Sequence, residues 1–184
     1  MLLTRYGEFT IEVLQKYIQI CYVNAKAYSD DLSNQNAAMV ISKEGKFGPT
    51  VPNRIPDGVV KSDERIKVRP TKYDFIEHAE RGAIYGAASE GICTEGGILI
   101  CPWYACESCA RAIICSGIKT VVGHKQRCDL TSHGRSKIVD TVSDRWVNPI
   151  SNGELMLKEA GIECLYLDFH AGCEVLINEQ LMEV

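Results

Sequence analysis

The amino-acid sequence predicts an α/β domain in which helices cover both faces of a β-sheet. Segments with the hydrophobic period of an amphipathic helix alternate along the chain with short apolar runs that are typical of buried strands. Glycine or proline stands at several of the boundaries, where these residues commonly end an element. The length of 184 residues suits one domain with a sizeable core. We therefore expect a single domain over residues 1–184.

In the N-terminal part, a helix is predicted over residues 8–28. Its apolar residues recur three and four positions apart: Val13, Leu14, Tyr17, Ile18 and Cys21. The apolar run 37–42 predicts a strand. Residues 48–70 hold four of the six prolines, and proline both fixes φ and lacks an N–H. We expect a long ordered loop there, and loops of that length are usually functional or disordered.

The rest of the chain alternates helix and strand before a final hairpin. The expected elements are a helix over 78–91, a strand over 96–101, a helix over 106–117, a strand over 118–124, a helix over 148–160, a strand over 162–168 and a hairpin over 173–184. Gly117 and Gly161 stand where glycine commonly follows a helix. Asn148 and Pro149 fit an N-cap followed by a first-turn proline. The hairpin is expected to turn at Asn178.

Composition excludes several classes of protein. The net charge of −4 and the pI near 5.6 argue against broad binding to a nucleic-acid backbone, which needs a basic face. No apolar run approaches the roughly 18 residues that a membrane span needs. The start of the chain lacks the apolar core of a secretory signal, so we expect a cytoplasmic protein. Its nine cysteines are then expected to be reduced, and some of them to bind metal. Six are expected to be core thiols: Cys21, Cys93, Cys101, Cys115, Cys164 and Cys173.

Two short motifs predict a catalytic zinc site. His78 and Glu80 open one predicted helix, and Cys106 and Cys109 open another helix that follows a buried strand. Two thiolates and one imidazole are ligands that zinc prefers, and three protein ligands leave the fourth tetrahedral position for water. A helix N-terminus favours the thiolate form of cysteine. Glu80 is then placed to take a proton from the water and to deliver it to a substrate nitrogen.

The alternatives to this interpretation are a chance pattern and a structural zinc site. A lone H-x-E or a lone C-x-x-C is unremarkable. Both motifs in this order, separated by about the 28 residues between His78 and Cys106, are expected by chance in about one chain in a hundred. A structural site is closed by four ligands, whereas this constellation has three and an acid. His124, Cys128 and His133 fit no structural zinc pattern, so residues 123–133 are expected to form a loop with ordinary polar side chains.

The segments "HAERGAIYGAASEG" and "CPWYACESCARAIICSGIKTVVGH" resemble the zinc-binding core of the cytidine and deoxycytidylate deaminases. That family carries H-x-E followed by P-C-x-x-C, with the glutamate as acid and base. The resemblance spans about residues 37–168 and is closest to the deoxycytidylate (dCMP) deaminases. It implies a three-layer α/β/α fold around a five-stranded mixed sheet, usually assembled into homo-oligomers.

The resemblance also implies chemistry: water attacks C4 of a cytosine ring, and ammonia leaves. By position, Zn²⁺ is held by His78, Cys106 and Cys109, and Glu80 is the proton shuttle. The sequence departs from the family pattern at two positions. Ala105 replaces the proline before the first cysteine, and alanine can adopt the same backbone angles, so we expect zinc binding to persist. Gly82 replaces a frequent asparagine and is expected to affect subunit or substrate contacts.

The substrate prediction depends on the loop before the zinc helix. "NRIPDG" resembles the N-G-x-P-x-G loop of dCMP deaminases, which places Asn53 at the sugar and Arg54 near a phosphate, whose oxygens match a guanidinium fork. Residues 61–72 carry a local excess of positive charge: Lys61, Arg65, Lys67, Arg69 and Lys72 against Asp63 and Glu64. The alternative for this segment is a solvated basic loop. Ala79 and Tyr104 complete the expected contacts, and Trp103 either stacks on the base or packs in the core.

The expected function is hydrolysis of dCMP to dUMP, which feeds thymidylate synthesis. "WVNPISNGELMLKEAGIECLYLD" resembles the end of dCMP deaminases and favours them over tRNA adenosine deaminases. The alternatives are a deaminase of cytidine, deoxycytidine or another cytosine compound, and a non-catalytic zinc protein. Relatives that take dCMP are often regulated by dCTP and dTTP with Mg²⁺, so Mg²⁺ with a nucleotide effector is a further candidate. The expected partners are a small molecule and other copies of the chain, with neither nucleic acid nor membrane.

Overall fold

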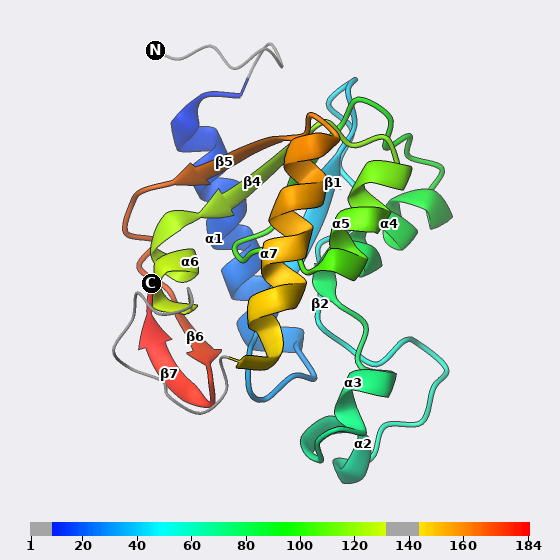
Figure 1. Cartoon of the computed structure of the whole chain (residues 1–184), viewed down its shortest axis with the longest axis vertical. Helices are drawn as coiled ribbons and strands as arrows, with labels where there is room; N and C mark the ends of the chain where they lie inside the picture. Colours follow the sequence, from blue (N-terminus) through cyan, green and yellow to red (C-terminus); the bar gives the residue numbers. More distant parts are fainter. Residues whose placement is uncertain (1–8, 132–143) are drawn as a thin grey trace.

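The computed structural model describes residues 9–131 and 144–184, which form an α/β domain (Figure 1). The strands are β1 (Ala37–Ile41), β2 (Val51–Pro52), β3 (Ile98–Ile100), β4 (Thr120–His124), β5 (Glu163–Leu167), β6 (Glu174–Ile177) and β7 (Gln180–Glu183). The helices are α1 (Ile11–Tyr28), α2 (Asp63–Lys67), α3 (Lys72–Phe75), α4 (Ala79–Ser89), α5 (Glu107–Cys115), α6 (Lys125–Thr131) and α7 (Asp144–Glu159). These elements confirm the predicted alternation of helix and strand.

The central sheet has five strands in the order β2-β1-β3-β4-β5. Strand β1 runs antiparallel to β2 and β3, with Val40 opposite Leu99. Strands β3, β4 and β5 are parallel, and Leu99 lies opposite Val121. The sheet is therefore mixed, as the resemblance implied. The predicted hairpin is also present, because β6 and β7 pair around a turn at Asn178 and Glu179.

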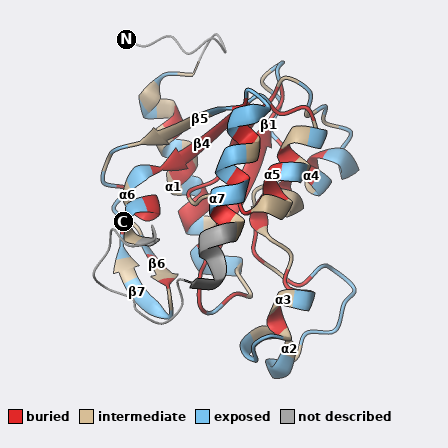
Figure 2. Ribbon diagram, in the orientation of Figure 1, coloured by how far each residue is buried: buried red, intermediate tan, exposed pale blue. Residues whose placement is uncertain are grey.

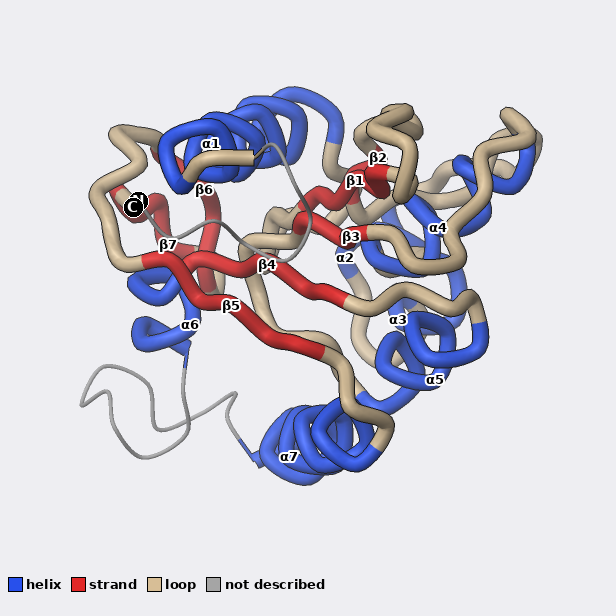
Figure 3. The backbone as a smooth tube through the Cα atoms, turned by 90° about the horizontal axis from the view of Figure 1, so that it is seen from above, coloured by secondary structure: helices blue, strands red, loops and turns tan. Residues whose placement is uncertain are grey.

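Helices cover both faces of the sheet because successive strand residues point to opposite sides. Ala38 and Val40 face one core, which includes buried residues of α4, α5 and α7. Ala37, Met39 and Ile41 face the other core, which is completed by α1 and the β6–β7 hairpin. Figure 3 shows α1 on one side of the sheet and α5 and α7 on the other. Figure 2 shows the central strands buried between these layers.

The segment 48–70 is not wholly a loop, which corrects the prediction. Residues 51–52 pair with Ala37 and Ala38 as an edge strand, where a proline is tolerated. Helix α2 follows because Ser62 caps it, accepting a hydrogen bond from the backbone N–H of Arg65. The prediction was wrong because prolines exclude long helices and strands but allow elements as short as β2 and α2. In Figure 1, α2 and α3 project from one end of the molecule.

Two further element predictions need correction. Helix α7 begins at Asp144, so that Pro149 lies inside the helix rather than in its first turn. The missing N–H then removes one helical hydrogen bond, which the rest of the helix tolerates. Residues 125–131 form α6 instead of a loop, while His133 lies outside the described residues. Of the six expected core thiols, Cys93 and Cys115 are exposed.

Two glycines allow α4 to approach the edge of the sheet. A Cβ at Gly82 would lie 2.8 Å from a methyl carbon of Val51, and one at Gly86 would lie 2.6 Å from Cγ of Pro49. Gly82, where the family often has asparagine, therefore has a packing role in this chain. No helix in the described part of the chain has both the length and the apolar character that crossing a membrane requires.

Candidate active site

The starts of α4 and α5 bring the three predicted zinc ligands together. His78 is the N-cap of α4 and Cys106 is the N-cap of α5, each with extended backbone angles, while Cys109 lies in the first turn of α5. His78 Nδ1 is 3.6 Å from the sulfur of Cys106 and 3.5 Å from that of Cys109. All three donor atoms lie within 4.8 Å of one another. This set of one imidazole and two sulfurs fits the preference of zinc.

The contacts within the cluster favour the ionised form of Cys106 and the neutral form of Cys109. A hydrogen bond from Cys109 lowers the pKa of Cys106 to about 3, with help from His78 and against the opposing effect of burial. The hydrogen bond to Cys106, together with burial, raises the pKa of Cys109. One thiolate and one thiol thus share a proton, and a bound metal ion replaces such a proton when it takes both sulfurs as ligands.

Arg81 is a neighbour of the cluster that sequence reasoning missed. Its NH1 group donates to the sulfur of Cys109 at 3.7 Å, and its Nε donates to the carboxylate of Glu77 at 2.7 Å. The same Glu77 oxygen accepts from the backbone N–H of His78 at 2.8 Å. Arg81 therefore places positive charge beside the sulfur of Cys109, which favours the ionised form that a metal ligand needs. Its position one turn after Glu77, at (i, i+4) spacing, was the available signal.

Glu80 lies beside the ligands in the first turn of α4 and is only 3% exposed. Burial raises the pKa of this carboxyl above its usual range, although His78 acts in the opposite direction. Glu80 and His78 line the same pocket. A buried carboxyl with a raised pKa can both accept and donate a proton near neutral pH.

The loop that carries Cys106 is held closely against α7. A Cβ at Gly153 would lie 2.4 Å from the carbonyl oxygen of Ala105 and 3.0 Å from the carbonyl carbon of Cys106. Only glycine allows this separation between helix and loop. Ala105, which replaces the proline of the family pattern, is itself 4% exposed. The loop is therefore fixed by tertiary packing, which the sequence patterns did not indicate.

A pocket extends from this cluster across the ends of several elements. The space between its walls is about 670 Å³ when the open solvent at its mouth is included. Its walls are formed by Asp31, Asn34, Asn36, Asn53, Arg69, Lys72, Tyr73, Ile76, His78, Glu80, Trp103, Tyr104, Cys106 and Ile150. Three buried polar atoms in these walls have no hydrogen-bond partner among the described residues: Asn36 Oδ1, Asn53 Oδ1 and Trp103 Nε1. Such groups are costly unless a ligand or water satisfies them.

The structure brings together some of the predicted substrate contacts and separates others. Asn53 and Tyr104 line the pocket. Arg54 lies outside its walls, with its guanidinium 2.9 Å from the carboxylate of Asp57. Ala79 is fully buried and is not part of the lining. Trp103 lines the pocket and also carries the guanidinium of Arg127 over its ring, at 5.2 Å.

The basic residues of segment 61–72 divide in the same way. Lys61 pairs with Asp30, Lys67 pairs with Asp63, and Arg65 lies over the ring of Phe75, so these three are engaged outside the pocket. Arg69 and Lys72 line the pocket. Lys72 is 2% exposed, and its ammonium donates to Asp31 at 2.8 Å and to Ser33 at 3.0 Å.

Residues 31–36 form a pocket wall that sequence reasoning missed. Asp31 Oδ1 accepts from the backbone N–H groups of Ser33 and Asn34 at 2.8 and 3.0 Å. Asn36 donates to the sulfur of Cys101 at 3.2 Å. The run "DLSNQN" of short polar residues before a buried strand was the available signal, since such residues favour hydrogen-bonded turns.

Comparison with known proteins supports a family relationship. The family model for the cytidine and deoxycytidylate deaminase zinc-binding region matches residues 11–125. Curated deoxycytidylate deaminases from Pongo abelii and Mus musculus are 28% and 29% identical over 119 residues, which is 61% of this chain. The match spans 64% of the length of those relatives.

Solved structures share the fold. A dCMP deaminase of the cyanophage S-TIM5 superimposes with a TM-score of 0.59 at 18% identity, covering 86% of this chain and all of that one. The Thermotoga maritima diaminohydroxyphosphoribosylaminopyrimidine deaminase/reductase superimposes with a TM-score of 0.54 at 23% identity, covering 83% of this chain and 36% of that one. These similarities confirm the predicted three-layer fold class.

Proposed function

This chain belongs to the cytidine and deoxycytidylate deaminase family, and on that premise we propose that it hydrolyses dCMP to dUMP and ammonia. One observation carries the proposal: His78, Cys106 and Cys109 form one cluster of metal-ligating atoms, and His78 and Cys106 line the same pocket as Glu80. Within the described residues the metal-ligand cluster has three members, which leaves a coordination position for water. A structural zinc site would need a fourth ligand and no adjacent acid.

Zinc held by His78, Cys106 and Cys109 would supply an activated water at neutral pH. Glu80 takes a proton from the attacking water and delivers it to N3 of the cytosine ring. The same carboxyl then takes the second proton of that water from the oxygen now bonded to C4 and passes it to the amine, so that the C4–N bond breaks and ammonia leaves, because its position beside the cluster serves both transfers. Arg81 supports the reaction indirectly, because its charge beside Cys109 favours the ionised sulfur.

The residues that line the rest of the pocket have groups suited to contact a nucleotide. The unpartnered Oδ1 of Asn53 is suited to accept a hydrogen bond from a sugar hydroxyl. The aromatic rings of Trp103 and Tyr104 line the wall against which a base can stack. Arg69 and Lys72 supply donors for a phosphate. Arg69 and Lys72, from the predicted basic segment 61–72, therefore replace Arg54 as the proposed contacts to the phosphate.

A panel of substrates tests the proposal. Ammonia release from dCMP, CMP, dCTP, deoxycytidine and cytosine should show the highest kcat/KM for dCMP. Equal values for dCMP and deoxycytidine would leave a nucleoside deaminase. Zinc-loaded protein that releases ammonia from none of the five would favour the non-catalytic zinc protein instead.

Two expectations from the family remain proposals for this chain. We propose that it forms homo-oligomers. Light scattering on the purified protein measures the molar mass in solution and so tests this proposal. Large apolar side chains are exposed on and near α1 and α4, and these are the kind of surface that a second copy can cover: Ile20, Val23, Tyr28, Phe47 and Tyr85. Regulation by dCTP or dTTP with Mg²⁺ is tested by adding each nucleotide to the dCMP assay, with and without the metal.

A further inference from the structure

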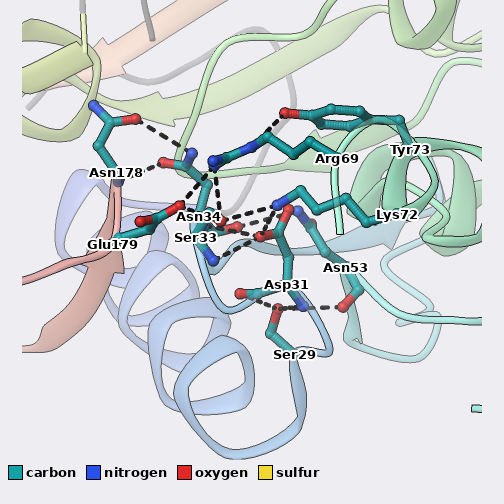
Figure 4. Close-up of polar contacts among 10 residues, drawn as sticks. All are labelled: Ser29, Asp31, Ser33, Asn34, Asn53, Arg69, Lys72, Tyr73, Asn178 and Glu179. Atoms are coloured by element: carbon teal, nitrogen blue, oxygen red, sulfur yellow. Dashed lines mark hydrogen bonds and ion pairs between the residues drawn. The ribbon is translucent and has the colours of Figure 1, made fainter. Parts of the chain in front are cut away.

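The turn of the C-terminal hairpin contacts the pocket wall. Asn34 donates its side-chain amide to Asn178 Oδ1 at 3.3 Å, and the backbone N–H of Asn178 donates to Asn34 Oδ1 at 3.1 Å. The backbone N–H of Glu179 donates to the carbonyl of Ser33 at 2.9 Å. Figure 4 shows the two turn residues beside Ser33 and Asn34. Residues far apart in sequence therefore form one rim of the pocket.

Arg69 crosses this rim, and three segments of the chain hold its guanidinium. Its Nε donates to the hydroxyl of Tyr73 at 3.0 Å, and its NH2 group donates to Ser33 Oγ at 3.0 Å. The same NH2 group lies 2.9 Å from the carboxylate of Glu179. The Arg69 side chain is 39% exposed, so without these contacts it would be free to turn into solvent. Arg69 and Tyr73 both line the pocket, and Figure 4 shows Arg69 between Tyr73 and Glu179.

The backbone of the hairpin turn is unfavourable for a glutamate. Asn178 and Glu179 both have positive φ, at 50° and 67°. Two-residue turns of this kind favour Asn-Gly, because glycine adopts positive φ without steric cost. Glutamate at the second position therefore weakens the turn. The ion pair that its side chain makes with Arg69 is a contact that glycine could not provide.

We propose that Glu179 is a positioning residue that holds Arg69 at the rim, where Arg69 binds the phosphate of the nucleotide. This inference rests on the proposed function and adds to it a specificity element supplied by the hairpin. Glu179 and Ser33 hold the NH2 group of Arg69 and Tyr73 holds its Nε, which leaves the NH1 group for the substrate. If Glu179 instead competed with the phosphate for Arg69, its removal would strengthen nucleotide binding, so the two roles predict effects of opposite sign.

The test uses two substitutions at Glu179 and a matched control. Glu179→Gln keeps the size of the side chain and removes its charge, whereas Glu179→Gly also relieves the positive φ. Glu174→Gln is the control, because Glu174 lies on the same hairpin and pairs with Lys26 at 3.1 Å, away from the pocket. Kinetic constants for dCMP and deoxycytidine are measured for each zinc-loaded variant, together with the thermal midpoint.

We expect both Glu179 variants to lower the preference for dCMP over deoxycytidine by about two- to fivefold, as loss of an exposed ion pair allows. The change should appear in KM for dCMP rather than in kcat. Glu179→Gly should also raise the thermal midpoint, which separates loss of positioning from loss of folding. Glu174→Gln should leave the preference unchanged. An increased preference for dCMP in either Glu179 variant would overturn the proposal in favour of competition.

The double variant Arg69→Ala/Glu179→Gln shows whether Glu179 acts through Arg69. We expect it to match Arg69→Ala alone, whereas an additional independent loss would overturn the positioning role. Binding of dUMP and deoxyuridine to the wild type distinguishes the two levels of failure. If the wild type prefers dUMP and Glu179→Gln preserves that preference in full, the positioning role is wrong while the proposed function stands. If the wild type shows no preference for the phosphate, the nucleotide proposal is wrong and the role of Glu179 falls with it.

Discussion

The two ends of the pocket are built in different ways. At the inner end, the donor atoms and Glu80 come from two helix starts within residues 78–109. At the rim, the polar side chains come from four separate stretches: residues 31–36, 53, 69–73 and 178–179. Each inner residue occupies a defined position in a helical turn. The rim residues instead meet through hydrogen bonds between loops, the short helix α3 and the hairpin turn.

This difference separates chemistry from selectivity. A reaction at a metal site needs atoms at fixed mutual positions, and the rigid start of a helix provides them. Recognition of a particular substrate is commonly placed on loops, which can change without disturbing the scaffold. Substitutions at the inner end should therefore abolish turnover on every substrate, whereas those at the rim should change the ranking of substrates.

The largest effect is expected from loss of a zinc ligand. Cys106→Ala should reduce zinc from about one ion per chain to near none, abolish deamination and lower stability, because the metal joins two helix starts. Metal analysis and thermal unfolding measure these changes. Cys115→Ala is the matched control on the same helix, since Cys115 is exposed. Full zinc content in Cys106→Ala, or far less than one ion per chain in the wild type, would contradict the ligand assignment.

The second-largest loss of activity is expected when the proposed proton shuttle, Glu80, is removed. Glu80→Gln should keep the zinc and the fold yet lower kcat by about 10³–10⁴, because an amide cannot carry a proton and general acid–base groups typically contribute up to about that much. Rapid-mixing assays with dCMP measure it. Glu90→Gln, at the far end of the same helix, should behave as the wild type. We would abandon Glu80 as the shuttle if Glu80→Gln kept more than about a tenth of wild-type turnover.

At the rim, Arg69→Ala should lower kcat/KM for dCMP by about 10- to 150-fold, the loss expected for one charge-assisted hydrogen bond. The slower reaction with deoxycytidine should change little. Arg54→Ala should have no such effect, because the guanidinium of Arg54 pairs with Asp57 outside the pocket. A selective loss in Arg54→Ala but not in Arg69→Ala would restore the assignment that the sequence suggested.

The smallest effect on turnover is expected at the contact between α7 and the ligand loop. Gly153→Ala introduces a methyl group where the nearest backbone oxygen lies 2.4 Å away, so the helix or the loop must shift. Overpacking of this kind typically costs about 1–3 kcal/mol. Chemical denaturation should show that loss, and zinc should dissociate faster. Asn152 is an exposed neighbour, and Asn152→Ala should show neither change. If Gly153→Ala kept the wild-type unfolding free energy and rate of zinc dissociation, the loop would adapt freely to the added methyl group.

The sequence predicted the inner end better than the rim for a physical reason. His78, Glu80 and the two cysteines are recognisable because ligand spacing follows helix geometry over a few residues. The glycine after α5 was predictable for the same local reason. The roles of Asn34 and Glu179 depend on contacts across more than 100 positions, with Asn178 and Arg69 respectively, which no local pattern encodes.

Arg54 and Gly153 illustrate the same limit. Arg54 has the right chemistry in the right segment, yet the antiparallel bridge between Arg54 and Glu77 fixes the backbone where the side chain meets Asp57. Gly153 resembles any glycine in a helix until the loop of Cys106 is placed beside it. In both cases the residue type was visible, and its function depended on a neighbour from another part of the fold.

The dispersed origin of the rim also has a consequence for synthesis on the ribosome. The proposed zinc ligands and Glu80 have all been made once residue 109 is added, after β1 and β3 and before β4. The rim must wait for residue 179, which supplies a partner for Arg69. Because domains acquire long-range contacts late, a nascent chain should gain its metal-binding residues well before it gains the complete rim.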